Sequence, residues 1–490
     1  MQNPPNLLAS MLSLIGRNKE IAQLSKLIAQ PQPNFIAVYG RRRIGKTMLI
    51  RQVFGEHTTC LEVTGIKDGN TTAQLAQFSH HFALLEEGRP PFANWMDAFH
   101  ALTEWVKHRA DAKPFTLFLD ELPWLASPRS GLLQALEVFW NSQWSQLPKF
   151  NLVVCGSAAS WMLNKIINSK GGLHNRITYR LHLMPFTLQE AEALLQAKGC
   201  RFSHKQITDL YMVTGGVPFY LDAIVKNASV AQNINRLCFQ EGGLLRDEFD
   251  RLFAALFDHS DTHVRIIRAI AKRRYGMSRN DCLAETKLTS GGFFNERLYE
   301  LEASGFITRY VPLGKKAKDA HYRVTDEYAL FYLRWIEPTR HTGFTPRQDY
   351  WQTKVNAPEW LSWAGYAFEG ICMKHVDQLA QALGLSRVGY QAHTWRSPVN
   401  SEQGAQIDLL LDRDDDAITV VEIKYSRKAF VLDKHIAMNL TQKLSVFQHA
   451  TKTQKQLLLA MVTPAGVKKN VWCEELLDAS VGLEALFNNA

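Results

Sequence analysis

Hydrophobic and polar positions follow two alternating patterns over the first half of the chain. From residue 18 to about residue 257, short apolar runs of strand length are separated by stretches of helical period. The strand-length runs are residues 35–39, 59–63, 115–119, 152–155 and 177–183. Such an alternation is typical of helices that cover a largely parallel sheet. An α/β domain is therefore predicted here.

The pattern becomes helical after the last of these runs. Thr187 and Glu190 have the spacing of a capping box, which satisfies free N–H groups at the start of a helix, and a helical stretch is predicted from there to about residue 256. Three helices are expected near residues 262–273, 279–285 and 290–303. Two strands, 306–311 and 321–325, then flank a turn at 313–319. Three helices followed by a hairpin predict a winged helix.

Periodicity lapses between Glu337 and Pro358, where three prolines occur, so a linker is predicted there. Beyond it the pattern indicates a helix at about 360–383, strands at 388–395, 405–411 and 417–424, a helix around 435–448 and a strand at 456–462. The predicted domains are residues 1–185, 186–258, 259–336 and 359–490, with the linker at 337–358.

Composition narrows the class of protein. The chain has 490 residues, of which 46% are hydrophobic and 21% charged, and this excludes a disordered or low-complexity chain. No apolar run approaches the roughly 20 residues that a membrane helix needs, so no membrane partner is expected. The opening stretch lacks Lys or Arg ahead of its apolar part, which argues against a secretory signal. A cytoplasmic location is expected.

Charge gives the first hint of a partner. The net charge is +9, and basic residues outnumber acidic ones by five within residues 261–335 alone. A concentrated basic surplus favours nucleic acid, because Lys and Arg neutralise phosphates. Many soluble basic proteins bind none, so the surplus needs support from motifs.

The segment after the first apolar run matches GxxxxGK[ST] in full. It consists of Gly40, Arg41, Arg42, Arg43, Ile44, Gly45, Lys46 and Thr47. In such a loop the glycines let backbone N–H groups surround phosphate oxygens, the lysine reaches the β- and γ-phosphates and the hydroxyl holds Mg²⁺. The loop follows a predicted strand and opens a helical segment, as this chemistry requires. ATP with Mg²⁺ is the expected cofactor.

Two carboxylates end the apolar run at 115–119. Asp120 is expected to bind Mg²⁺ and Glu121 to orient or deprotonate the water that attacks the γ-phosphate. Ser157 ends the next run and is a candidate γ-phosphate sensor. A polar residue closing a strand is the alternative for Ser157.

These motifs resemble those of the archaeal-type ATPase family, within the AAA+ and STAND group of P-loop ATPases. The resemblance also rests on Ile15-Gly16-Arg17, Gly215-Gly216-Val217-Pro218 and Tyr322-Arg323-Val324-Thr325-Asp326 leading into Leu330-Phe331-Tyr332. It implies an ATPase core, a helical lid, a winged helix and a C-terminal nuclease-like domain. It also implies that Arg176 contacts the γ-phosphate of its own or a neighbouring subunit, which makes a homo-oligomer possible; a plain surface arginine is the alternative.

The predicted winged helix carries charges of both signs. Arg265, Arg268 and Lys272 share one side of its first helix, with Arg273 and Arg274 following, and its turn carries Lys315, Lys316 and Lys318. Both groups suit phosphates. The third helix holds three glutamates, which argues against reading bases in the major groove. A winged helix used for packing or oligomerisation is the alternative.

Acids and a lysine gather near the C-terminus. Asp408 lies in one predicted strand, and Glu422 and Lys424 lie on one side of the next, because side chains alternate along a strand. Asp408 and Glu422 are expected to hold one or two Mg²⁺ or Mn²⁺, and Lys424 to orient water or stabilise developing charge. Glu369, on the preceding helix, is a candidate further acid for this metal site.

The helix, the strand with Asp and the strand with ExK resemble the PD-(D/E)xK nuclease superfamily. The proline that precedes the aspartate in its name is absent here. The resemblance implies a restriction-endonuclease-like α/β domain. An ATP-hydrolysing, DNA-processing protein with metal-dependent DNA cleavage is therefore expected. The alternative is a non-nucleolytic ATP switch that binds nucleic acid or a protein partner.

Overall fold

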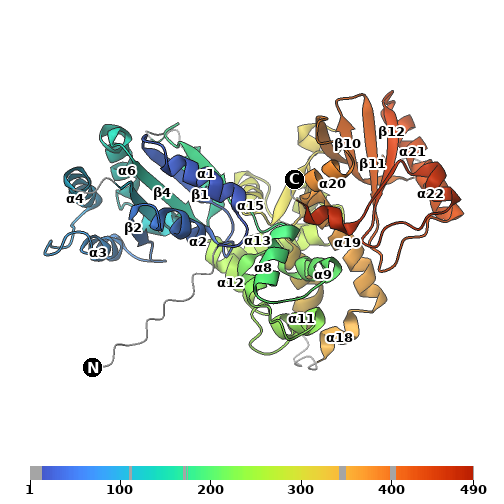
Figure 1. The fold of residues 1–490 in the computed structure, drawn as a ribbon, viewed down its shortest axis with the longest axis horizontal. Coiled ribbons are helices and arrows are strands. Elements are labelled where there is room, and N and C mark those ends of the chain that lie inside the picture. Colours follow the sequence, from blue (N-terminus) through green and yellow to red (C-terminus); the bar gives the residue numbers. More distant parts are fainter. Residues whose placement is uncertain are drawn as a thin grey trace. The chain divides into compact units, whose positions relative to one another are not determined.

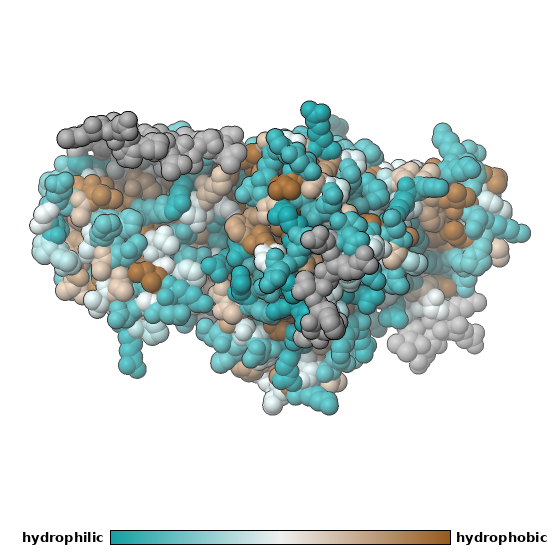
Figure 2. Space-filling view, turned by 90° about the horizontal axis from the view of Figure 1, so that it is seen from below, coloured by the Kyte–Doolittle hydropathy of each residue, from teal (hydrophilic) through white to brown (hydrophobic). Residues whose placement is uncertain are grey.

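The computed structural model describes residues 14–109, 113–168, 171, 173, 175–340, 349–397 and 404–488. The chain divides into two compact units, Met1–Met184 and Pro185–Ala490, which are described separately. Figure 1 shows a sheet flanked by helices in the first unit and a second sheet near the C-terminus. Within the described residues, no helix is long and apolar enough to cross a membrane. Hydrophilic residues cover most of the face in Figure 2, with hydrophobic ones scattered among them.

The first unit is built on a parallel sheet with the order β2-β3-β4-β1-β5. Its strands are β1 (Asn34–Tyr39), β2 (Thr59–Thr64), β3 (Phe115–Asp120), β4 (Phe150–Gly156) and β5 (Tyr179–His182). Every residue of β3 and β4 is buried, because helices cover both faces of a parallel sheet. The prediction of an α/β domain with a parallel sheet is confirmed.

Successive residues of β1 contribute to two core layers. Phe35 and Ala37 pack with α3 (Thr71–Phe82), α4 (Trp95–His108) and α6 (Leu132–Ser142), whereas Ile36 and Val38 pack with α1 (Asn18–Ile28) and α2 (Lys46–Ile50). The helical segments of this unit are α1 (Asn18–Ile28), α2 (Lys46–Ile50), η1 (Arg51–Gly55), α3 (Thr71–Phe82), α4 (Trp95–His108), α5 (Leu122–Leu125), α6 (Leu132–Ser142), η2 (Trp144–Gln146), α7 (Ala159–Trp161) and η3 (Met162–Ile167).

The second unit begins with a helical region. It contains α8 (Leu188–Ala197), α9 (His204–Thr214), α10 (Pro218–Asp222), α11 (Val230–Cys238) and α12 (Glu248–Leu256). The capping box at the start of α8 is present as expected: Thr187 Oγ1 accepts from the Glu190 backbone, and the Glu190 carboxylate accepts from the Thr187 N–H.

Three helices and a small antiparallel sheet follow. They are α13 (Ser260–Ala271), β6 (Met277–Ser278), α14 (Arg279–Thr286), α15 (Gly292–Ala303), β7 (Ile307–Tyr310), η4 (Ala317–Asp319) and β8 (His321–Val324). The strand order is β6-β8-β7. The helices and the hairpin thus lie where the pattern placed them. The chain continues through α16 (Glu327–Phe331), η5 (Tyr332–Ile336), α17 (Glu337–Arg340) and α18 (Tyr350–Lys354).

A mixed sheet with the order β13-β12-β11-β10-β9 forms the last part. Strand β10 pairs antiparallel with both β9 and β11, whereas β12 pairs in parallel with both β11 and β13. The elements are α19 (Pro358–Lys374), α20 (Val376–Ala382), β9 (Tyr390–Arg396), β10 (Gln406–Arg413), β11 (Ala417–Ile423), α21 (Lys434–Thr451), β12 (Gln456–Val462), α22 (Val471–Leu476), β13 (Ala479–Val481) and η6 (Leu483–Phe487).

The single helix expected at 360–383 is two helices, α19 and α20, which meet at His375. The His375 ring is buried, its Nδ1 lies 2.8 Å from Ile371 O, and its Nε2 accepts from Leu188 N at 3.1 Å. Burial lowers the pKa of His375 to about 4, so the neutral ring can accept this bond. The break follows from a contact with α8 that no local pattern encodes.

The described residues of the expected linker, 337–340 and 349–358, are largely helical and packed. Trp351 of α18 is fully buried, and its backbone N–H donates to Asn235 Oδ1 at 2.8 Å. Pro358 is the first residue of α19, a position that proline favours. Pro338 lies in the uninterrupted helical run of α16, η5 and α17, and Pro346 lies outside the described residues. The same apolar cluster runs from Phe186 to Phe487. The helical region α8–α12, the three helices with the small antiparallel sheet, and one side of the C-terminal mixed sheet therefore share this core.

Candidate functional site

The phosphate-binding loop connects β1 to α2 and curves around the Lys46 side chain. Gly40 and Gly45 have φ angles of 144° and 88°, which favour glycine. Lys46 is buried, and its Nζ donates to Gly40 O at 3.0 Å, Arg41 O at 2.9 Å and Ser157 Oγ at 3.0 Å. The ammonium is thereby held over the loop, where a phosphate would need it.

Gly40 has no room for a side chain. A Cβ there would lie 2.3 Å from Leu183 O and 2.9 Å from Ile44 Cδ1. Gly40→Ala is therefore expected to lower both the thermal midpoint and ATP affinity, since the loop must shift away from β5. Backbone strain of this kind costs on the order of 1–3 kcal/mol. Thermal unfolding and nucleotide titration measure the two effects. The control is Gly55→Ala, where a Cβ meets nothing within 4 Å; equal losses in both variants would contradict the prediction.

Thr47 and Asp120 come together next to this loop. Thr47 Oγ1 donates to Asp120 Oδ2 at 2.8 Å, and the Glu121 N–H donates to Asp120 Oδ1 at 3.0 Å. Burial raises the pKa of Asp120, and the neighbouring Glu121 charge adds to the increase. A hydroxyl and a carboxylate are hard oxygen ligands that suit Mg²⁺. These two side chains fit the predicted magnesium position.

Ser157 joins the lysine to the second acid. Glu121 Oε2 accepts from the Ser157 N–H at 3.0 Å, and Glu121 Oε1 accepts from Ser157 Oγ at 2.5 Å. Glu121 itself has a φ of 47°, the left-handed region that costs non-glycine residues about 1–3 kcal/mol. The structure thus brings Lys46, Ser157 and Glu121 together. Arg176, by contrast, is exposed in the turn before β5 and forms no hydrogen bond with these three among the described residues.

A second group of charged side chains lies where β10 and β11 run side by side. Their register pairs Leu409 with Val421, which sets Asp408 beside Glu422. The Ile423 N–H donates to Asp408 Oδ2 at 3.3 Å. Burial raises the pKa of Asp408, and the charge of Glu422 raises it further. The structure therefore brings together the two acids that the sequence singled out.

Two lysines neutralise Glu422. Lys424 Nζ lies 2.7 Å from its Oε1, and Lys443 Nζ lies 2.8 Å and 3.0 Å from its two oxygens. Burial opposes the ionisation of Glu422, but the two ammonium charges outweigh it and lower its pKa. Lys443 was not predicted. Its only sequence signal is its place on the helix that follows the ExK strand.

Glu369 does not join these acids. It is buried on α19 and forms an ion pair with Arg274, which follows α13. Within the described part of the chain, no three His, Cys, Asp or Glu side chains lie close enough to hold a metal ion. The expectation that Glu369 completes a metal site is therefore wrong: its carboxylate anchors α19 to the segment between α13 and β6.

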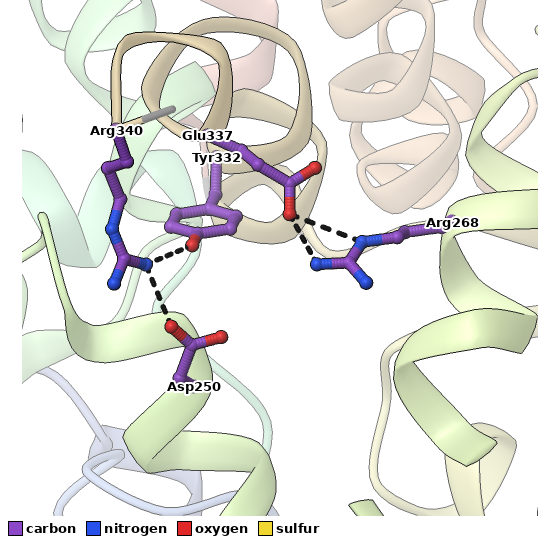
Figure 3. A pocket seen from close by; sticks show the side chains of 5 residues that line it. All are labelled: Asp250, Arg268, Tyr332, Glu337 and Arg340. Carbon is purple, nitrogen blue, oxygen red and sulfur yellow. Dashed lines mark hydrogen bonds and ion pairs between the residues drawn. The ribbon is translucent and has the colours of Figure 1, made fainter. Parts of the chain in front are cut away.

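Four of the eight basic residues expected to face phosphates have partners within the chain, Arg274 among them through Glu369, whereas Arg273 is exposed. Arg265 donates to Thr286 O, Lys272 pairs with Glu285 at 2.6 Å, and Arg268 pairs with Glu337 at 2.5 Å. Figure 3 shows Arg268 turned toward Glu337 across a pocket, opposite Arg340, which contacts Asp250 and Tyr332. Lys315, Lys316 and Lys318 remain exposed.

Comparison with known proteins supports the first site. Residues 14–224 match the family described as "ATPase domain predominantly from Archaea". This stretch, which includes the phosphate loop, Asp120, Glu121 and Ser157, is an archaeal-type P-loop ATPase domain. The match ends at residue 224, before the strands that carry Asp408 and Glu422.

Individual proteins are similar over longer stretches. An uncharacterized protein of Methanocaldococcus jannaschii is 23% identical over 416 residues, covering 84% of this chain and 87% of that protein. A Walker-type ATPase of Pyrococcus abyssi is 16% identical, with a TM-score of 0.46. The similarity covers 66% of this chain and 96% of that ATPase. RuvB of Thermotoga maritima is 15% identical, with a TM-score of 0.34. The similarity covers 68% of this chain and 96% of RuvB.

Proposed function

We propose that the chain is an ATP-hydrolysing, DNA-processing protein whose C-terminal sheet carries a metal-dependent nuclease site. The observation that carries the nuclease half is the side-by-side placement of Asp408 and Glu422 on adjacent strands, with Lys424 bound to Glu422. The ATPase half rests on the phosphate loop and on the family match over residues 14–224. The nuclease half would act on a phosphodiester.

In the ATPase half, Lys46 and the loop N–H groups would bind the phosphates of ATP. Thr47 and Asp120 would hold Mg²⁺, which neutralises charge on the β- and γ-phosphates. Glu121 would turn from Ser157 to orient water, while Ser157 would stay near the γ-phosphate. Arg176 is exposed, so it is free in space to reach a nucleotide in another copy of the chain, and a homo-oligomer remains part of the proposal.

The Glu121→Gln variant separates binding from hydrolysis. The amide keeps the size of the side chain but removes the negative charge that would polarise water. ATP is therefore expected to bind with nearly unchanged affinity and to be hydrolysed about a hundredfold more slowly. Nucleotide titration and phosphate release measure the two. Glu104→Gln, on α4, is the control, because its side chain is 40% exposed and pairs only with groups of the same helix; normal turnover in Glu121→Gln would assign the water to another group.

In the nuclease half, Asp408 and Glu422 would supply carboxylate oxygens to Mg²⁺ or Mn²⁺, which lowers the pKa of a bound water and stabilises phosphate charge. Lys424 would orient the water or stabilise the negative charge that develops on the phosphate. Lys443 would release the Glu422 oxygens as the metal enters, because it contacts both of them.

The direct test incubates the purified chain with labelled DNA and RNA, with Mg²⁺ or Mn²⁺ and with or without ATP. Cleavage of DNA supports the proposal. If neither nucleic acid is cut under any of these conditions while ATP is hydrolysed, the chain is instead a non-nucleolytic ATP switch.

A further inference from the structure

The loop of residues 311–320, between β7 and β8, is docked on the edge of the C-terminal sheet. We call it the hairpin loop. The Leu313 N–H donates to Thr394 O of β9 at 3.3 Å. The Leu313 side chain packs against the apolar cluster that contains Trp395 and Ile407. The hairpin loop therefore contacts the strand at the edge of the sheet that carries Asp408.

The contact falls at the level of the acids. On β9 and β10, Trp395 pairs with Ile407 and His393 with Leu410, with an irregularity between them. Thr394 accordingly lies opposite the stretch that begins with Asp408. Neighbouring strands lie about 4.8 Å apart, so the Leu313 backbone is roughly 10 Å from the Asp408 strand and roughly 15 Å from the Glu422 strand.

Further contacts fix the small antiparallel sheet, and the segment that precedes it, to β9 and α19. Arg274 pairs with Glu369 of α19. Arg323 of β8 stacks on the Tyr366 ring of α19, 5.0 Å from its centroid. Arg396 of β9 lies 5.9 Å from the Tyr275 ring. Arg323 of β8 and the segment before β6 thus contact α19 and β9, and together they hold the small antiparallel sheet in one orientation relative to Asp408.

The hairpin loop is also where positive charge remains available. Lys315, Lys316 and Lys318 are exposed, and no described acidic side chain forms an ion pair with their ammonium groups; the one acid of the loop, Asp319, accepts from the Lys316 backbone N–H at 3.3 Å. Arg265 and Arg268 of α13 have the internal partners given above, and Arg273, which follows this helix, is a single exposed charge. On α15, Glu296 is 55% exposed, which would repel phosphate. A polyanion approaching this region is attracted by the loop rather than by α13 or α15.

We propose that the hairpin loop binds the phosphate backbone of duplex DNA and holds it at a fixed distance from the site of Asp408, Glu422 and Lys424. This inference rests on the proposed function and adds a surface and a spacing to it. A span of 10–30 Å, allowing for the loop and its side chains, corresponds to about three to nine nucleotides at 3.4 Å each. Contact and cleavage are thus expected within about ten nucleotides of each other.

Binding is tested first, in EDTA, so that cleavage plays no part. The variant carries Lys315→Ala, Lys316→Ala and Lys318→Ala. Its affinity for duplex DNA is expected to fall by up to about 500-fold at 0.1 M salt, and the slope of log affinity against log salt to flatten by up to about 2.7, since each phosphate contact contributes about 0.9. The control replaces three exposed lysines elsewhere, Lys226, Lys287 and Lys452, and removes the same charge. Equal losses in both variants, or none in the first, would overturn the proposal.

The spacing is tested with a photo-cross-linking amino acid at position 316, still in EDTA. The cross-linked nucleotide is mapped, and the cut is mapped on the same DNA with Mn²⁺. Separation within about ten nucleotides supports the proposal, and a larger or random separation overturns it. If DNA is cut under none of the conditions but binding depends on Lys315, Lys316 and Lys318, the DNA-binding surface is supported and the proposed nuclease site is contradicted. If cutting is normal while those lysines have no effect, the nuclease stands and this surface fails.

Discussion

Lys46→Ala is expected to reduce ATP turnover by at least about a hundredfold. The Lys46 ammonium is the buried cation of the phosphate loop, and it donates to two loop carbonyls and to Ser157. In the proposed complex, Lys46 Nζ exchanges these hydrogen bonds for bonds to phosphate oxygens of ATP. Alanine therefore removes a charge that stabilises both bound ATP and the transition state of its hydrolysis. Removal of one such donor typically costs about 10²–10³ in rate.

The effect must be separated from unfolding, because the side chain is buried. Thermal unfolding is measured beside phosphate release, and Lys46→Met, which keeps most of the apolar stem, serves as a second variant. Lys67→Ala, an exposed position in the same unit, is the control. If a folded Lys46 variant released phosphate at the normal rate, the loop would not be the nucleotide site.

Asp408→Asn is expected to lower the rate of metal-dependent DNA cleavage about 10²–10³-fold or more, without changing ATP turnover. The amide has the shape of the acid but is a poorer ligand, and a metal supplies several kcal/mol of charge stabilisation. Asp408 belongs to the unit from residue 185 onward, whereas Lys46 belongs to the first unit. Metal affinity is expected to fall together with cleavage.

Two matched variants sharpen this result. Asp412 lies on the same strand as Asp408, but its carboxylate pairs with Lys455 at 2.7 Å. The Asp412→Asn variant should therefore keep DNA cleavage. Lys424→Ala should retain metal affinity and lose mainly the rate, as expected for a group that stabilises transition-state charge. Undiminished cleavage by Asp408→Asn would place any nuclease activity at another site or in a contaminant.

The strands were predictable because burial on both faces leaves a clear local pattern. The runs at 115–119 and 456–462 became β3 (Phe115–Asp120) and β12 (Gln456–Val462) with at most one residue of difference. The phosphate loop was equally visible, since its chemistry needs fixed spacing within eight residues. Asp408 and Glu422 could be paired because adjacent antiparallel strands follow each other closely in the chain.

Contacts between distant segments were not predictable in the same way. Arg274 and Glu369 are 95 residues apart, and nothing near either one indicates that they meet. Lys443 lies on a helix between two strands, and only the packing of that helix turns it toward Glu422. The proline at 358 gave a misleading signal, because proline suits the first turn of a helix as well as a linker.

The core that runs from Phe186 to Phe487 sets a limit on how this chain can be divided. Trp351 and Trp360 are fully buried in it, and both lie at or beside the boundary where a modular protein would be cut. A fragment beginning at residue 359 would expose apolar surface that the helical region now covers. The C-terminal sheet is therefore not a cassette to be exchanged between ATPases, and any recombination that kept it folded would have to carry the preceding helices with it.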